Sequence, residues 1–231
     1  MKKLFYILIL ITGLANAQIV NIPDANFKAK LLSASTSNSI AKNSSGVNMI
    51  VDVNSDGEIQ VSEAFNVYQL NVSSSNIASL IGLSSFLNLQ RLECSQNLIT
   101  EIDISQLINL NFFGGFNNPL ISLDCNSNIN LVSVYIQSQT LKYLFIKNGV
   151  DENITMDSGS WTELFCCNPN LEYVCCDNSQ FDSVLEMINQ FQLTNCEVNT
   201  YCTITPGGNY NTIVGQIQYD EDNNGCDVND G

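Results

Sequence analysis

The sequence predicts an α/β solenoid that is mostly β, with short helices closing its ends. Two interleaved repeats indicate this fold class. A pattern of Leu-x-x-aliphatic-x-small recurs at a constant interval, at Leu89, Leu110 and Leu131. The same half-pattern recurs with the same interval at Ile99, Leu120 and Leu141. A fixed period of this length is typical of a coil in which each unit stacks only on its neighbours.

Each half-pattern predicts a short strand, because alternate side chains of a strand point to the same side. The first column of half-patterns begins at Val67, Leu89, Leu110, Leu131, Asp151 and Leu171. The second begins at Ile77, Ile99, Leu120, Leu141, Trp161 and Phe181. Together they predict about six coils of 20–22 residues around one apolar core. A polar position follows the first column at Ser75, Asn97, Asn118, Gln139, Gly159 and Ser179, and its asparagines predict a partial hydrogen-bonded ladder between coils.

Both ends of such a coil need a polar closure, because each end exposes an apolar cross-section. At the start, Asp24 to Leu32 predicts a short amphipathic helix capped by Asp24. The stretch 33–46 is polar and predicts a loop. At the other end, Asp182 predicts the cap of a helix whose apolar face is Val184, Leu185, Ile188 and Phe191.

These segments resemble the bacterial leucine-rich repeat proteins, in the secreted form common in Bacteroidota. The likeness is carried by Leu89 to Asn97, by Asn21 to Lys28 and by Gly57 to Ala64, and it covers about residues 20 to 202. The resemblance implies a right-handed leucine-rich repeat coil. It also implies binding to an extracellular protein or polysaccharide rather than any particular activity.

The ends of the sequence divide it into four parts. Residues 1–17 have a basic start, an apolar run and a small-x-small site, which predicts a signal peptide. The N-terminal cap spans 18–66, and the solenoid with its C-terminal cap spans 67–202. Residues 203–231 are predicted to be a linker and the start of a truncated β domain. The expected location is therefore secreted or at the bacterial cell surface, with no transmembrane segment.

The amino-acid composition argues against two classes of function, nucleic-acid binding and histidine-dependent catalysis. The formal charge is -15, with a single arginine (Arg91) and no histidine. Such a surface disfavours nucleic acid, whose phosphates need Lys and Arg. The lack of histidine also excludes any Ser-His or Cys-His mechanism.

One motif carries specific chemistry. Residues 52–63 match the calcium loop of EF-hands. The predicted ligands are Asp52, Asn54, Asp56, the backbone carbonyl of Glu58, Gln60 through a water, and Glu63. Val47 to Val51 is expected to be extended, so no helix enters the loop; an acidic turn held by hydrogen bonds without metal is the alternative. A second acidic stretch, Asp220 to Asp227, has similar spacing, but Gly231 stands where an EF-hand has its final Glu. The sequence therefore leaves open whether this stretch binds a second calcium ion.

Nine cysteines in an exported chain suggest disulfides. Four of them occupy inward positions, where a thiol packs as a small hydrophobe: Cys94, Cys125, Cys166 and Cys176. Cys196 and Cys202 lie just past the last coil and are the predicted disulfide pair.

Outward-facing aromatic residues suggest where a ligand could bind. The predicted face consists of Arg91, Phe112, Phe116, Tyr135 and Tyr173. The aromatic side chains could instead simply pack on one another. We therefore expect a non-catalytic binding or adhesion module, stabilised by calcium. The alternatives are a β-solenoid polysaccharide lyase and a passive spacer for a downstream domain.

Overall fold

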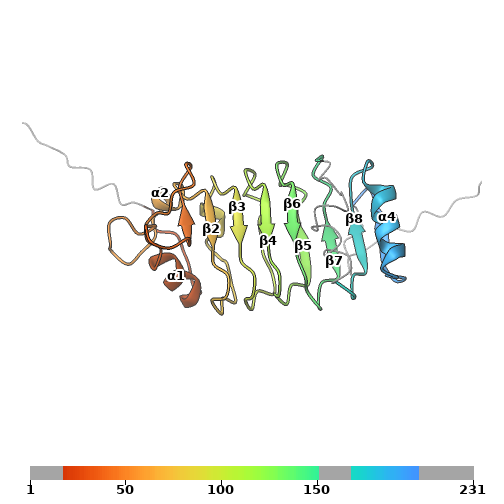
Figure 1. Ribbon diagram of the computed structural model, residues 1–231, viewed down its shortest axis with the longest axis horizontal. Coiled ribbons are helices and arrows are strands. Elements are labelled where there is room, and N and C mark those ends of the chain that lie inside the picture. The colour runs from red at the N-terminus through yellow and green to blue at the C-terminus, as the bar shows by residue number, and fades with distance from the viewer. Residues whose placement is uncertain (1–17, 151–167, 203–231) are drawn as a thin grey trace, which may run out of the picture.

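The computed structural model describes residues 18–150 and 168–202. Figure 1 shows an elongated stack of coils with α1 and α2 at one end and α4 at the other. In chain order the elements are α1 (Ala25–Leu32), β1 (Ala41–Lys42), α2 (Val61–Ala64), β2 (Gln69–Asn71), the 3-10 helix η1 (Leu83–Ser85), β3 (Arg91–Glu93), β4 (Phe112–Gly114), β5 (Ser122–Asp124), β6 (Ser133–Tyr135), β7 (Tyr143–Phe145), β8 (Tyr173–Cys175), α4 (Phe181–Gln190) and β9 (Glu197–Asn199).

The described strands form two sheets, which we call the first and second sheet. The first has the order β1-β2-β3-β4-β6 and the second the order β5-β7-β8-β9. All the pairs within these sheets are parallel except β1 with β2. Parallel pairing follows from the coil itself, because each turn brings the chain back in the same direction. The predicted fold class, a mostly-β leucine-rich solenoid with short helical caps, is confirmed.

The predicted inward columns form the core. In the first sheet Leu70, Leu92, Phe113 and Val134 stand directly opposite one another, and all are buried. Leu123, Leu144, Val174 and Val198 form the corresponding column of the second sheet. A single coil could not bury these side chains, so their transfer free energy, about 2 kcal/mol for each fully buried aliphatic residue, is gained only by stacking.

The repeat shifts between β7 and β8. The described residues form about five turns of the solenoid. Leu123 pairs with Leu144 at the regular interval of the repeat, whereas Leu144 pairs with Val174 across a longer one. As a result β8 joins the second sheet, although Leu171 was placed in the first column. Phe181, placed in the second column, instead begins α4. The expected coil at Asp151 and Trp161 lies outside the described residues, as do the predicted signal peptide and the region after 202.

The predicted ladder is confirmed at its two asparagines. Asn97 accepts from the backbone N–H groups of Ser75 and Ile77, and its amide donates to the carbonyls of Val72 and Cys94. In the next coil Asn118 accepts from the N–H of Ile99 and donates to the carbonyls of Cys94 and Gly115. At two of the other polar positions, Gln139 and Ser179 are exposed, and the neighbouring Ser138 and Gln180 are buried instead.

A second, outer ladder was not predicted. Four asparagines one residue before the first-column positions donate to carbonyls of the preceding coil: Asn88 to Phe65, Asn109 to Leu87, Asn130 to Ile108 and Asn170 to Gln139. The repeated dipeptide Asn-Leu was a sequence signal that could have identified it.

Asp24 joins the N-terminal helix to the first coil. One carboxylate oxygen accepts from the N–H groups of Asn26 and Phe27, as predicted for the cap of α1. The other accepts from the N–H groups of Ala78 and Ser79, which are distant in sequence and belong to the first coil. Burial on its own raises the pKa of Asp24, but the four N–H donors outweigh it and hold the pKa below its ordinary value of 3.8.

Replacing Asp24 with alanine is expected to lower the free energy of unfolding by about 2 kcal/mol, the upper range for loss of a helix cap, because two further N–H groups also lose their acceptor. Since the folded-state pKa is depressed, this contribution is fully present above pH 3.8 and is lost as the pH falls through the folded-state value. Chemical denaturation of both proteins at pH 7 and at pH 3 measures it. A mutant that is equally destabilised at both pH values would contradict the charged cap.

The C-terminal helix α4 closes the far end of the stack with Val184, Met187 and Ile188 buried. Its cap differs from the prediction. The residue at the N-cap is Gln180, and Asp182 lies inside the first turn. Asp182→Ala is therefore a suitable control for Asp24→Ala.

Candidate functional site

Three of the predicted face residues meet on the outer surface of the first sheet. Arg91 on β3 lies opposite Phe112 on β4, and its guanidinium carbon is 3.4 Å from the centre of the phenyl ring. The ring of Tyr135, on β6, lies 5.2 Å from that of Phe112, with the planes inclined at 30°. All three side chains are half-buried. They therefore form a continuous stack across three strands, with a cation at one end and a phenol at the other.

Glu93 completes this group, which we call the first-sheet stack: Arg91, Glu93, Phe112 and Tyr135. Its carboxylate accepts from the guanidinium of Arg91 at 2.6 Å. The residue opposite Glu93 on β4 is Gly114. Because Gly114 has no side chain, the Glu93 carboxylate can lie over it; a Cβ there would collide with the carboxylate. The missing side chain at Gly114 thus leaves room for the ion pair to lie flat on the sheet.

Sequence reasoning missed a neighbouring part of this surface. A cavity of about 200 Å³ lies next to the stack, and Lys42, Gln69 and Asn71 line it together with Arg91 and Glu93. Lys42 belongs to β1, within a stretch predicted to be a loop. β1 pairs with β2 through backbone hydrogen bonds between segments that are distant in sequence. Such pairing produces no periodic pattern of residues in the sequence, so it could not be predicted.

The other two predicted face residues do not join the stack. Phe116 is half-buried and lies two residues past the end of β4. The prediction that Tyr173 belongs to the ligand-binding face was wrong. It lies in the second sheet, is 3% exposed, packs on Phe145 and donates its hydroxyl to Asn199. The shift of the repeat before β8 explains the error. Burial raises the pKa of Tyr173, despite its hydrogen bond to Asn199.

The predicted calcium loop is folded around Asp52. Its two carboxylate oxygens accept from the N–H groups of Asp56 and Gly57. The side-chain amides of Asn54 and Gln60 both donate to Asp56, each at 2.8 Å. An N–H bond from Glu58 is the main cause that lowers the pKa of Asp56. Side chains of four predicted ligands therefore converge, and their oxygens are of the hard type that calcium prefers.

The two remaining ligands are engaged elsewhere. Glu63 is buried, and its carboxylate accepts from the N–H groups of Val53, Asn54 and Gln60. The side chain of Glu58 pairs with Lys28 at 2.6 Å, which leaves its backbone carbonyl as the predicted ligand. In residues 18–150 and 168–202, no three His, Cys, Asp or Glu side chains are grouped so that they could hold a metal ion. The residue types fit calcium. Binding would require Glu63 to exchange N–H contacts for the ion, and Asn54 and Gln60 to turn their amide oxygens toward it in place of the N–H groups that now face Asp56.

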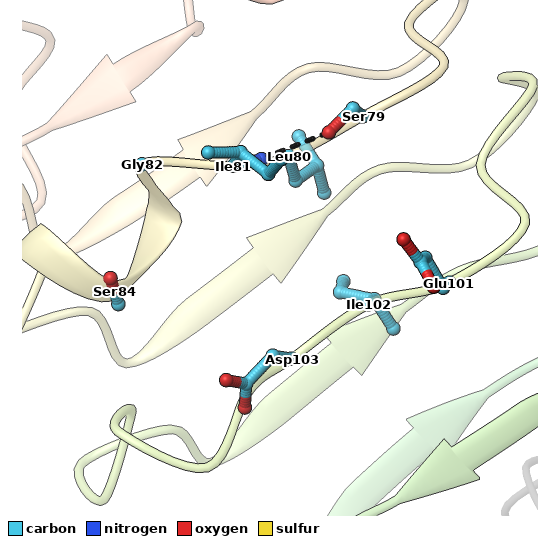
Figure 2. A pocket seen from close by; sticks show the side chains of 8 residues that line it. All are labelled: Ser79, Leu80, Ile81, Gly82, Ser84, Glu101, Ile102 and Asp103. Carbon is cyan, nitrogen blue, oxygen red and sulfur yellow. Dashed lines mark hydrogen bonds between the residues drawn. The ribbon is translucent and has the colours of Figure 1, made fainter. Parts of the chain in front are cut away.

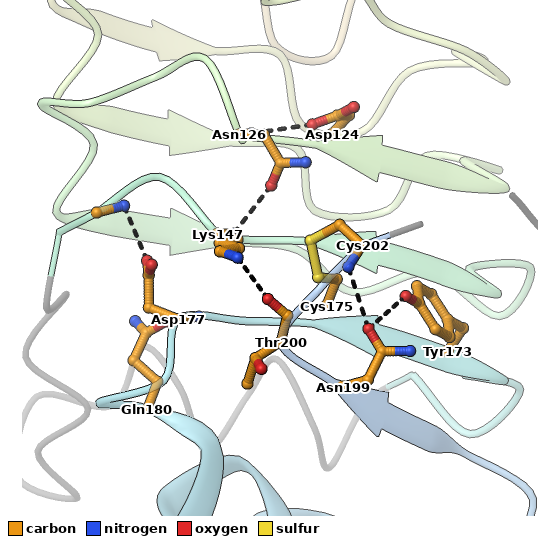
Figure 3. Close-up of a disulfide and its surroundings, with 11 residues drawn as sticks. Asp124, Asn126, Lys147, Tyr173, Cys175, Asp177, Gln180, Asn199, Thr200 and Cys202 are labelled. Atoms are coloured by element: carbon orange, nitrogen blue, oxygen red, sulfur yellow. Dashed lines mark hydrogen bonds between the residues drawn. A yellow bond between two sulfur atoms is a disulfide. The ribbon is translucent and has the colours of Figure 1, made fainter. Parts of the chain in front are cut away.

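The cysteines are paired differently from the prediction. Cys202 forms a disulfide with Cys175, not with Cys196 (Figure 3). β9 pairs with β8 so that Asn199 lies opposite Cys175, and the chain then turns back, with the N–H of Cys202 donating to Asn199. Cys196 precedes β9 and packs against the core; burial raises its pKa to about 12.

The inward cysteines behave as expected. Cys94, Cys125 and Cys176 are buried in the core. Burial raises the pKa of Cys176 to about 11, so its thiol stays protonated at neutral pH. The predicted inward position of Cys166 lies outside the described residues.

Comparison with known proteins identifies no family. No family model and no curated protein matches the chain. Among solved structures it is similar to the functional domain of InlJ from Listeria monocytogenes, described as including a cysteine ladder, at 19% identity and a TM-score of 0.39, over 69% of this chain and 38% of that one. It is also similar to an internalin, InlF, of the same species at 15% identity and a TM-score of 0.42, over 81% and 59%. A third similar structure is internalin C2, at 12% identity and a TM-score of 0.31, over 80% and 91%. The chain thus spans less than two thirds of the first two proteins.

No helix in the described part of the chain has the length and apolar character needed to cross a membrane.

Proposed function

We propose that this chain is a secreted or cell-surface leucine-rich repeat module that binds an extracellular protein through the first-sheet stack and has no catalytic activity. The observation that carries the proposal is the stack itself. Arginine, tyrosine and other aromatic residues dominate the binding energy of protein interfaces. Here Arg91, Phe112 and Tyr135 are held against one another on a rigid sheet, so little side-chain entropy is lost on binding.

The electrostatics of the face also suit a protein partner. Glu93 balances the charge of Arg91, so the stack itself carries no net charge within a chain of net charge -15. A planar guanidinium that already lies on a ring can still donate its remaining N–H groups to a partner's carbonyl or carboxylate oxygens.

Binding of the protein to arrays of immobilised extracellular-matrix proteins and of algal and bacterial polysaccharides tests the proposal. We expect saturable binding to a protein, weakened at least tenfold by Phe112→Ala or Tyr135→Ala, since loss of a central aromatic residue typically costs about 2 kcal/mol. Arg91→Lys should weaken it less than Arg91→Ala, because lysine keeps the charge without the planar fork.

Tyr201→Ala is the matched control. Tyr201 is an exposed aromatic residue at the C-terminal end of the described chain, and its replacement should leave binding unchanged. Binding confined to a polysaccharide, with the same loss in the variants, would change the partner class but keep the face. Binding that survives Phe112→Ala and Tyr135→Ala would overturn the assignment of the face.

The proposal includes a structural calcium ion in the loop 52–63, within the N-terminal cap. Raising calcium to about a hundred times its Kd is expected to stabilise the protein by about 2.7 kcal/mol relative to chelator. Asp56→Ala should abolish this shift in the thermal melt, because Asp56 is the carboxylate on which Asn54 and Gln60 converge.

Glu58→Gln provides the control for the calcium experiment. It removes the ion pair with Lys28 but keeps the backbone carbonyl, so the calcium-dependent shift should persist. If wild-type protein melts at the same temperature in calcium and in chelator, the loop is held by its own hydrogen bonds, and the proposal that it binds calcium is wrong.

A further inference from the structure

A groove runs across the first three coils on the side of the second sheet. One hollow of about 350 Å³ lies between residues 79–84 and residues 101–103 (Figure 2). A second, of about 320 Å³, lies between residues 100–102 and residues 121–124. Glu101 and Ile102 line both hollows, so the two hollows adjoin at the middle coil, and we call them together the groove.

The wall contributed by the first coil is preformed. Gly82 has a φ of +103°, and a Cβ there would lie only 2.7 Å from the carbonyl oxygen of Asn21. The N-terminal segment therefore packs directly against the backbone of this wall. Ser79, whose hydroxyl accepts from the N–H of Ile81, fixes the other end of the same segment.

Exposed aliphatic side chains line the groove. Ile81 is 56% exposed and Ile121 is 49% exposed, whereas Ile102, on the middle coil between them, is partly buried and packs against the core. Adjacent exposed apolar residues that line a concave surface are typical of interaction sites.

Carboxylates alternate with these aliphatic residues. Glu101, Asp103 and Asp124 line the groove, and no Lys or Arg side chain does. The salt bridges within the described residues involve none of the three. Lys142, which directly precedes β7 of the second sheet, is paired with Glu172 at 2.6 Å. A hydrogen bond from the Ser105 hydroxyl is the largest cause that holds the pKa of Asp103 below its ordinary value, so its negative charge persists at neutral pH.

The carboxylates are distributed over two neighbouring coils. Glu101 and Asp103 are two residues apart on the middle coil, and Asp124 follows Asp103 by one repeat on the next coil. The described residues do not gather three carboxylates closely enough for a metal ion. The charge is instead spread along the groove, beside its apolar residues.

We propose that this groove binds an extended basic segment of a partner protein, with Lys or Arg alternating with aliphatic residues. The cations would meet the three carboxylates and the aliphatic side chains would cover Ile81, Ile102 and Ile121. Charge complementarity selects this occupant. A second copy of the chain carries a formal charge of -15 and would be repelled. The groove is a second binding surface, separate from the first-sheet stack.

Fluorescence anisotropy with the labelled peptide (Lys-Val)6 tests the proposal. The full chain should bind it saturably, at least tenfold more tightly than (Lys-Ser)6, which has the same charge but lacks aliphatic side chains. The triple variant Glu101→Gln, Asp103→Asn, Asp124→Asn should weaken binding of (Lys-Val)6 at least tenfold. Ile81→Asn with Ile121→Asn should bring the affinities for the two peptides together without changing the charge.

The control variant Asp182→Asn, Glu186→Gln, Glu197→Gln removes three exposed carboxylates at the far end of the solenoid, so both triple variants have the same net charge. It should bind like the wild type, as should Phe112→Ala, which tests the first-sheet stack. Circular dichroism verifies the fold of each variant. Equal weakening by both triple variants, or equal binding of both peptides to the wild type, would overturn the proposal, because either result means that the overall charge alone holds the peptide.

Discussion

Asn97→Ala is expected to lower the free energy of unfolding by about 3–4 kcal/mol, although the change creates only a small cavity. Asn97 is buried and joins two coils through at least four backbone groups: it accepts from two N–H groups and donates to the carbonyls of Val72 and Cys94. Each buried polar group left without a partner costs about 1–3 kcal/mol, and partial relaxation of the turn keeps the sum below the maximum. Thermal and urea unfolding followed by circular dichroism measure the loss.

Asn109→Ala is the matched control. Asn109 belongs to the outer ladder, is exposed, and makes one side-chain bond, to the carbonyl of Leu87 at 2.9 Å. Water can replace that bond, so the cost should be about 0.5 kcal/mol. If the two variants lose the same free energy of unfolding, the buried hydrogen bonds of Asn97 add no more stability than an exposed one. The apolar columns alone would then hold the coils together.

Replacing Cys175 and Cys202 with serine is expected to destabilise the C-terminal cap by about 3 kcal/mol, because the disulfide closes a loop with a sequence separation of 27. The loss should be local, since each coil of a solenoid contacts only its neighbours. Amide hydrogen exchange should therefore show lost protection in β9 and α4, while β3 and β4, which lie farther from this cap, keep theirs. Reduction of the wild-type protein should reproduce the pattern.

Cys196→Ser separates the two possible pairings. Cys196 is unpaired in the structure, so this variant should retain the disulfide and the protection of β9. Loss of protection in Cys196→Ser equal to that in the double variant, with an additional free thiol by titration, would restore the pairing of Cys196 with Cys202.

The sequence identified elements that depend on local pattern. The inward columns recur with a constant period, and the residues at those positions, such as Leu92 and Leu123, are buried in the structure. Asp24 was recognised as a helix cap because it precedes an apolar face at helical spacing. The two buried asparagines of the inner ladder were recognised from the same repeat.

Errors began where the repeat changed length. Tyr173 was assigned to the wrong sheet because a longer interval replaces the regular one between β7 and β8. The disulfide was misassigned for a related reason: Cys175 and Cys202 meet only because β9 pairs with β8. Cys196 was predicted as the partner of Cys202 because it is near in sequence, whereas Cys175 is the actual partner because it is near in space.

By itself, the sequence determined the solenoid, the identity of its core residues and the N-terminal cap, because these depend on periodic burial and on contacts between near neighbours. Only the tertiary structure decided which outward residues share a surface. Whether Arg91, Phe112 and Tyr135 stack, or whether Glu101, Asp103 and Asp124 line one groove, depends on how successive coils are aligned. That alignment is set by the length of each turn and by backbone hydrogen bonds between coils. Outward side chains carry no hydrophobic period that would reveal it.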